Sequence, residues 1–131
     1  MKMRKEYTCP LEIVHDIVKG KWKTIIIFQL RNGGKSLSNL EHEIEGITQK
    51  MLLEQLKELR EFCVVQKKSF DGYPLRVEYS LTGERGQELL QAIQIMQQIG
   101  IDYLLEHGKQ DILEEKGIPY KDRIHCIPTK K

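Results

Sequence analysis

The residues best suited to recognition chemistry lie together around position 48. Thr48, Gln49 and Lys50 open a segment with helical spacing, and Gln55 lies about two turns further along. A glutamine side chain can pair bidentately with adenine, and a lysine can reach guanine or a phosphate. Because a helix N-terminus points its N–H groups at anions, this segment is suited to contact with nucleic acid. The alternative, a solvated helix start with a good cap, stays open.

A second set of candidate contacts is the basic trio Lys67, Lys68 and Arg76, which flanks a turn at residues 71–74. Lysine and arginine bind phosphates, and an arginine can also enter a narrow minor groove, so we expect Arg76 to contribute more than the lysines. The alternative is that lysines on an edge strand only prevent edge-to-edge association. Ser36, the expected N-cap of an earlier helix, completes the set of candidate contacts.

Cys9 is the residue best placed for covalent chemistry. It directly precedes Pro10 at a predicted helix start, where backbone N–H groups and the helix dipole favour a thiolate, with Lys5 adding positive charge. Such a thiol can be reactive, and oxidation would leave the product open among a sulfenic acid, a small-thiol adduct and a disulfide with a partner chain. The alternative is a compact buried side chain in a dimer interface. An enzyme with Cys9 as nucleophile is disfavoured, because no base lies within sequence reach.

The cysteines and histidines do not share the spacing of metal ligands or of a disulfide framework. They are Cys9, Cys63 and Cys126, together with His15, His42, His107 and His125. We therefore expect no metal and no cofactor. Cys63 is expected to be an inert core or turn residue.

Composition and charge indicate one ordinary globular domain. The chain has 131 residues, of which 40% are hydrophobic and 31% charged, values typical of a folded protein. The net charge is only +2, but residues 1–80 hold 14 Lys and Arg against 11 Asp and Glu, whereas residues 81–131 hold 7 against 8. The start lacks a secretion signal, and no apolar run approaches the roughly 20 residues of a membrane helix. We therefore expect a cytoplasmic protein with no membrane partner.

Hydrophobic spacing and capping residues predict four helices before the basic trio. The predicted ranges are 10–19, 22–30, 37–44 and 49–61. The isoleucines of 22–30 could equally form a strand, but the neighbouring elements favour a helix. Ser36 and Thr48 are the expected N-caps of the third and fourth helices. In the fourth helix, Leu52, Leu56 and Leu59 recur at intervals of four and three, and they are expected to face the core.

Two strands and two further helices are predicted in the rest of the chain. Residues 64–70 and 75–81 have strand character and flank Asp-Gly and Pro turn signals, which predicts a β-hairpin. Thr82 is expected to cap a long helix, with Met96 in the core. The apolar stripe of this helix is Leu89, Ile93, Met96, Gly100 and Tyr103. A short helix around 111–116 and a loosely ordered tail at 119–131 complete the chain.

This order of elements defines the predicted fold. Helix, glycine-bearing turn, helix and two-stranded hairpin make a winged helix-turn-helix, which lays one helix in a major groove while the hairpin reaches flanking DNA. The predicted class is α+β: a mainly helical winged helix-turn-helix with a two-stranded β-hairpin wing and a long C-terminal helix. The whole chain, 1–131, is expected to be a single domain.

Four motifs make the sequence similar to one family. They are Cys9-Pro10-Leu11-Glu12, Gly20-Lys21-Trp22-Lys23, Ile47-Thr48-Gln49-Lys50-Met51-Leu52, and Arg76-Val77-Glu78-Tyr79-Ser80-Leu81-Thr82 with the following Gly86. Over residues 9–100 the chain resembles the HxlR family of bacterial winged-helix transcription regulators, related to the MarR type, and residues 101–118 form a helical extension. The resemblance implies a homodimer on double-stranded DNA, with two recognition helices in successive major grooves. It also implies that the first helix and the C-terminal helices pack against their counterparts, which makes the long C-terminal helix a dimerisation helix. It also implies that Cys9 senses oxidants or electrophiles, as an N-terminal cysteine does in several members.

Three residues depart from the family pattern. Cys63 stands where a glycine usually ends the recognition helix, so it must accept a left-handed conformation or alter the turn. Ile99 replaces a common tryptophan near the end of the long helix, and Leu37 replaces an aromatic residue before the second helix of the motif. The fold prediction does not depend on these positions.

The function predicted from the sequence is a sequence-specific regulator that binds a palindromic operator as a homodimer and is controlled by thiol modification of Cys9. The alternative, from a different class, is a winged-helix protein-interaction module without base readout, in which the wing offers an edge to a partner strand.

Overall fold

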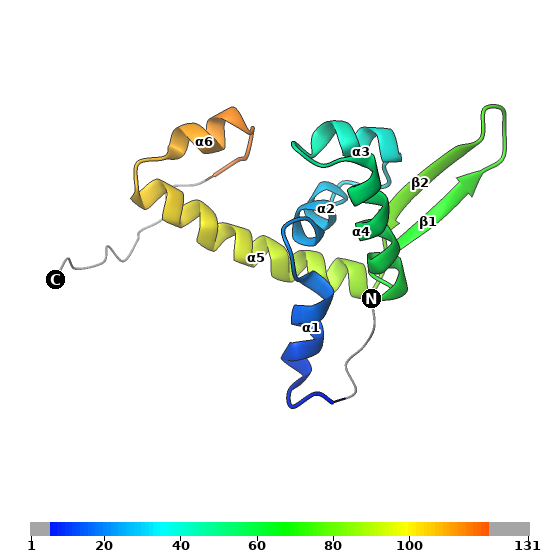
Figure 1. Ribbon diagram of the computed structural model, residues 1–131. Coiled ribbons are helices and arrows are strands. Elements are labelled where there is room, and N and C mark those ends of the chain that lie inside the picture. Colours follow the sequence, from blue (N-terminus) through cyan, green and yellow to red (C-terminus); the bar gives the residue numbers. More distant parts are fainter. Residues whose placement is uncertain (1–5, 121–131) are drawn as a thin grey trace. The chain divides into compact units, whose positions relative to one another are not determined.

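The computed structural model divides into two units. In the first unit, four helices and a hairpin follow one another in the predicted order (Figure 1). This unit ends at Gln91. Its elements are α1 (Pro10–Val18), α2 (Lys23–Gln29), α3 (Leu37–Glu43), α4 (Gln49–Glu61), β1 (Val65–Phe70), β2 (Arg76–Leu81) and the start of α5 (Arg85–Glu106). The structure describes residues 6–120. The predicted winged helix-turn-helix of the α+β class is confirmed.

Side-chain caps fix where α3 and α4 begin. The Ser36 hydroxyl oxygen accepts a hydrogen bond from the backbone N–H of Asn39, and the Thr48 hydroxyl oxygen accepts one from the backbone N–H of Met51, both at 3.2 Å. Each cap satisfies one of the N–H groups that a helix leaves unpaired at its start. Both predicted N-caps are confirmed.

The core of the first unit forms where α2, α3 and α4 meet. Eight apolar side chains are at most 1% exposed: Ile26, Ile27, Leu30, Leu40, Leu52, Leu56, Leu59 and Val64. The three leucines of α4 that were predicted to face the core are among them. Since burying a leucine side chain contributes roughly 1.5–3 kcal/mol, these three leucines determine which side of α4 faces outward.

The hairpin forms the wing, which projects from the helices of this unit (Figure 1). β1 and β2 are antiparallel, and their register runs from Val65 opposite Leu81 to Phe70 opposite Arg76. An isolated bridge adds a third partner: the N–H and C=O of Lys35 bond the C=O and N–H of Tyr79 at 2.9 and 2.8 Å. This bridge ties the loop before α3 to the wing.

Cys63 ends α4 in the left-handed conformation, with φ of 60°. Its backbone N–H bonds the carbonyl of Arg60 at 3.0 Å, and the N–H of Val64 bonds the carbonyl of Leu59 at 2.9 Å. These two bonds form a Schellman motif, in which glycine usually occupies the position that Cys63 holds here. The side chain is exposed, so Cys63 is a turn residue and not a core residue.

The second unit begins at Ala92 and contains the rest of α5 and α6 (Gln110–Glu115). α5 starts three residues after its predicted cap, although the Thr82 hydroxyl still accepts a hydrogen bond from the Gly86 N–H at 2.8 Å. The prediction of Met96 as a core residue is wrong, because its side chain is 56% exposed. Ile93, Ile101 and Leu113 are the buried apolar residues of this unit within the described range.

Several predictions fall outside the described residues or remain untested. Lys5 and Cys126 lie outside the described range, as does most of the tail at 119–131. The prediction that 1–131 is one domain stays a prediction. Within residues 6–120, no helix combines the length and apolar character that crossing a membrane requires.

Candidate nucleic-acid interface

The outward face of α4 is polar and charged along its first three turns. Gln49 and Lys50 are exposed in the first turn, as predicted, and Glu54 and Lys57 continue the exposed face on the side opposite the buried leucines. Leu53, which is 43% exposed, lies beside them. Sequence reasoning missed positions 53, 54 and 57, although the spacing of the buried leucines already implied that they face outward.

Gln55 differs in position from the other predicted contacts of α4. It is half-buried, because it lies between the exposed face and the side that carries Leu52 and Leu59. Ser36 and Thr48 have committed their hydroxyl oxygens to the helix caps as acceptors, which leaves each hydroxyl proton available as a donor. The two helix starts therefore offer hydroxyl and backbone donors, while Lys50 offers a charge.

The wing separates the three basic residues predicted to act together. In the β1–β2 register, Lys68 and Arg76 lie on one face of the hairpin, while Lys67 lies on the face of the buried Tyr79. The Lys67 ammonium is 6.0 Å from the centre of the Tyr79 ring. Lys67 and Lys68 are thus both exposed but point to opposite sides.

Arg76 is held by its neighbours on the outer face of the wing. Its guanidinium carbon lies 4.6 Å from the centre of the Phe70 ring, which is the cross-strand partner, and its Nε lies 3.7 Å from a carboxylate oxygen of Glu78. The side chain is still 64% exposed. These contacts orient the guanidinium without covering it. The ion pair itself adds little stability, since an exposed pair of this length contributes at most about 1 kcal/mol.

A nearly buried ion pair fixes α4 to α2. Lys23 is only 3% exposed, and it is the one charged residue that is buried within residues 6–120. Its Nζ lies 2.7 Å from a carboxylate oxygen of Glu58. Lys23 is also the first residue of α2, where the helix dipole disfavours a cation. The carboxylate of Glu58 therefore compensates an otherwise unfavourable charge, and it ties the C-terminal half of α4 to the core.

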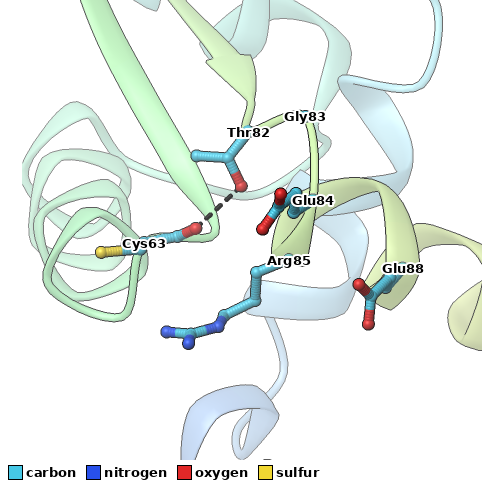
Figure 2. Close-up of a pocket in the computed structure, with 6 residues that line it drawn as sticks. All are labelled: Cys63, Thr82, Gly83, Glu84, Arg85 and Glu88. Atoms are coloured by element: carbon cyan, nitrogen blue, oxygen red, sulfur yellow. Dashed lines mark hydrogen bonds between the residues drawn. The ribbon is translucent and has the colours of Figure 1, made fainter.

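The C-terminal end of α4 has its own anchors, which line an open hollow of about 500 Å³ (Figure 2). The Thr82 hydroxyl donates to the carbonyl of Cys63 at 2.8 Å, and the Arg85 guanidinium donates to the carbonyl of Phe62 at 2.7 Å. These bonds satisfy carbonyls that the end of a helix leaves unpaired. Figure 2 shows the Cys63 sulfur on the side of its backbone away from Thr82 and Arg85, so the hollow does not enclose the thiol.

Cys9 is exposed at the start of α1, so its thiol is not buried by any other part of residues 6–120. The carboxylate of Glu12 accepts hydrogen bonds from the backbone N–H groups of Thr8, at 2.6 Å, and Cys9, at 3.2 Å. A negative charge therefore shares this helix start with the thiol, which disfavours anionic reagents there. Cys63 is exposed as well. No group of three or more potential metal ligands occurs between residues 6 and 120.

Comparison with known proteins gives consistent results. Residues 17–108 match the family model described as HxlR-like helix-turn-helix. Over 117 residues the chain is 38% identical to the HTH-type transcriptional regulator YkvN of Bacillus subtilis, which covers 87% of this chain and 98% of that relative.

Two solved structures of regulators are similar to this chain over most of its length. The redox regulator HypR in its oxidised form has a TM-score of 0.68 at 35% identity, covering 72% of this chain and 96% of that one. The reduced form of the transcriptional regulator YodB from B. subtilis has a TM-score of 0.63 at 35% identity, covering 70% and 89%.

Proposed function

Because this chain belongs to the HxlR-like helix-turn-helix family of transcriptional regulators, we propose that it binds a palindromic DNA operator as a homodimer, with α4 as its recognition helix. The observation that carries the proposal is the division of α4 into two sides. Leu52 and Leu56 are buried, whereas Gln49, Lys50 and Lys57 are exposed. The relatives named above are regulators and not enzymes.

The exposed residues divide into base readers and phosphate binders. Gln49 and Lys50, at the N-terminus of α4, have the donors and acceptors that read adenine and guanine in a major groove. Lys68 and Arg76 on the outer face of the wing supply positive charge for the flanking backbone or minor groove. The hydroxyl proton of Ser36, at the start of α3, is proposed to donate to a phosphate.

The second copy is proposed to cover apolar side chains that the single chain leaves in water. On α5 these are Ile95, Met96, Ile99 and Tyr103, each more than half exposed. On α1, Leu11 is 73% exposed and Val14 is 41% exposed. Apolar side chains gathered on one helix face mark an interaction surface, and a twofold dimer places two recognition helices about 34 Å apart, one turn of DNA.

A fluorescence-anisotropy titration tests the DNA-binding proposal. The probes are an inverted repeat from the protein's own promoter and a random duplex of equal length, each measured at several salt concentrations. Base readout adds about 4 kcal/mol or more, so the operator should bind roughly a thousandfold more tightly than the random duplex. Equal affinity for both duplexes would refute the proposal.

Two variants separate DNA reading from a protein-interaction role. Lys50→Ala should reduce the operator preference, and Arg76→Ala should weaken binding to both duplexes and lower the salt dependence. Lys109→Ala, at an exposed position of the second unit, serves as the matched control and should change neither. If Lys50→Ala and Arg76→Ala both regulate normally in cells, the winged helix acts as a protein-interaction module.

Modification of the Cys9 thiol is proposed to lower operator affinity. The support is the exposure of Cys9 at the start of α1, together with the similarity to regulators whose structures are described as redox regulators or as a reduced form. Treatment with diamide or methylglyoxal should release DNA from the wild type and from Cys63→Ser, but not from Cys9→Ser. Release from Cys9→Ser would show that another residue is the sensor.

A further inference from the structure

Glu54 is an acidic residue on the outward face of α4, and attraction to phosphates does not explain its presence there. It is exposed in the second turn, four residues after Lys50 and three before Lys57. A carboxylate on a face that approaches DNA is repelled by every nearby phosphate, so it weakens binding to all sequences alike. A carboxylate that weakens DNA binding in this way must make a favourable contact with a particular base if this face of α4 is to bind one operator tightly.

The structure leaves the Glu54 carboxylate free to make such a contact. Within residues 6–120 it forms no ion pair or hydrogen bond, although Lys50 and Lys57 lie at helical spacings that would allow one. By contrast, Glu58 on the same helix is paired with the buried Lys23. Lys50 precedes Glu54, which is the less favourable order for a pair at this spacing. The side chain is therefore uncommitted and directed outward.

We propose that Glu54 determines sequence specificity by accepting a hydrogen bond from the N4 amino group of a cytosine in each half-site. Cytosine presents a donor in the major groove with no acceptor beside it on the same base, which suits a carboxylate. Adenine also presents an amino donor, but its N7 acceptor would face the second carboxylate oxygen. The inference rests on the proposed function, since it names the base that the same helix reads.

The position along the helix relates this cytosine to the base pair read by Lys50. Four residues of α-helix rise about 6 Å, and base pairs are stacked about 3.4 Å apart. Glu54 therefore reaches a base pair about two steps from the one that Lys50 contacts. The repulsion from phosphates also gives Glu54 a second role, because it lowers the affinity for non-operator DNA.

Selection of tight binders from a randomised duplex library tests the inference. The proteins are the full-length wild type, Glu54→Gln, Glu54→Ala and the control Glu88→Gln, which removes an exposed carboxylate from α5. The wild type should select an inverted repeat with one C:G pair per half-site that Glu54→Ala no longer prefers. Glu54→Gln should prefer A:T there, because a glutamine offers both a donor and an acceptor to adenine.

Titrations on single duplexes give the expected size of the effect. Replacing the selected C:G pair should weaken wild-type binding roughly fivefold or more and should leave Glu54→Ala unchanged. Both Glu54 variants should bind random duplex more tightly than Glu88→Gln does. The same selected sequence for the wild type and both Glu54 variants would overturn the inference while leaving the proposed function intact. A wild type that selects no repeat would refute the proposed function, and the inference with it.

Discussion

Replacing Cys63 with glycine should stabilise the fold, because the left-handed backbone conformation of this turn favours a residue without a Cβ. Cys63 has φ of 60° and closes α4 through backbone hydrogen bonds alone. Its side chain is exposed, so Cys63→Gly removes no buried apolar contact and no hydrogen bond of the turn. The variant changes the conformational energy of one residue and little else.

The magnitude follows from two opposing terms. The left-handed conformation costs a residue with a Cβ about 1–2 kcal/mol. Glycine gives the unfolded chain extra freedom, which costs about 0.4–1 kcal/mol. The free energy of unfolding of Cys63→Gly should therefore exceed that of the wild type by roughly 1 kcal/mol, equivalent to a rise in Tm of about 3–5 °C for a chain of this length.

Urea unfolding followed by the fluorescence of Trp22, the single tryptophan, measures this difference. The protein concentration must be fixed, because dimerisation would couple to unfolding. Cys63→Ala is the matched control: it removes the thiol but keeps the Cβ, so its stability should stay within about 0.5 kcal/mol of the wild type. If the alanine and glycine variants are equally stable, the turn carries no strain and the reasoning fails.

Three further changes test the anchors of α4 and the α5 surface. Gly86→Ala should lower the free energy of unfolding by about 3 kcal/mol or more, since the added Cβ would lie 2.4 Å from the Val64 carbonyl oxygen; an unchanged urea midpoint would contradict this. Lys23→Met should cost about 1–3 kcal/mol by leaving the partly exposed Glu58 unpaired, and adding Glu58→Met should restore most of the loss. Ile99→Glu should convert the proposed homodimer to a monomer in sedimentation analysis with unchanged helical circular dichroism, whereas a dimer that persists in the variant would exclude this face from the interface.

Local signals made α4 and its neighbours predictable from the sequence. The hydroxyl caps at Ser36 and Thr48 and the spacing of the leucines act within one or two turns of helix, so they can be recognised without knowing what packs against them. The strained turn was also predictable, because Cys63 stands at a position that favours glycine.

Contacts between distant segments were not predictable in this way. The bridge between Lys35 and Tyr79 joins a loop to a strand far along the chain, and the pair of Lys23 with Glu58 joins two helices. The exposure of Met96 was missed for a related reason. Helical spacing identifies an apolar face, but it does not distinguish a face covered by the same chain from one left for a partner.

The anchoring of α4 separates its stability from its recognition chemistry. Buried leucines hold one side, the Lys23–Glu58 pair ties the helix to α2, and Thr82 and Arg85 bind carbonyls at its C-terminal end. None of these contacts involves the outward residues of the first two turns. Because surface substitutions away from packing and caps usually change stability by less than about 0.5 kcal/mol, changes at Glu54 should alter DNA binding without unfolding the protein. A loss of operator preference at that position can therefore be attributed to the contact itself.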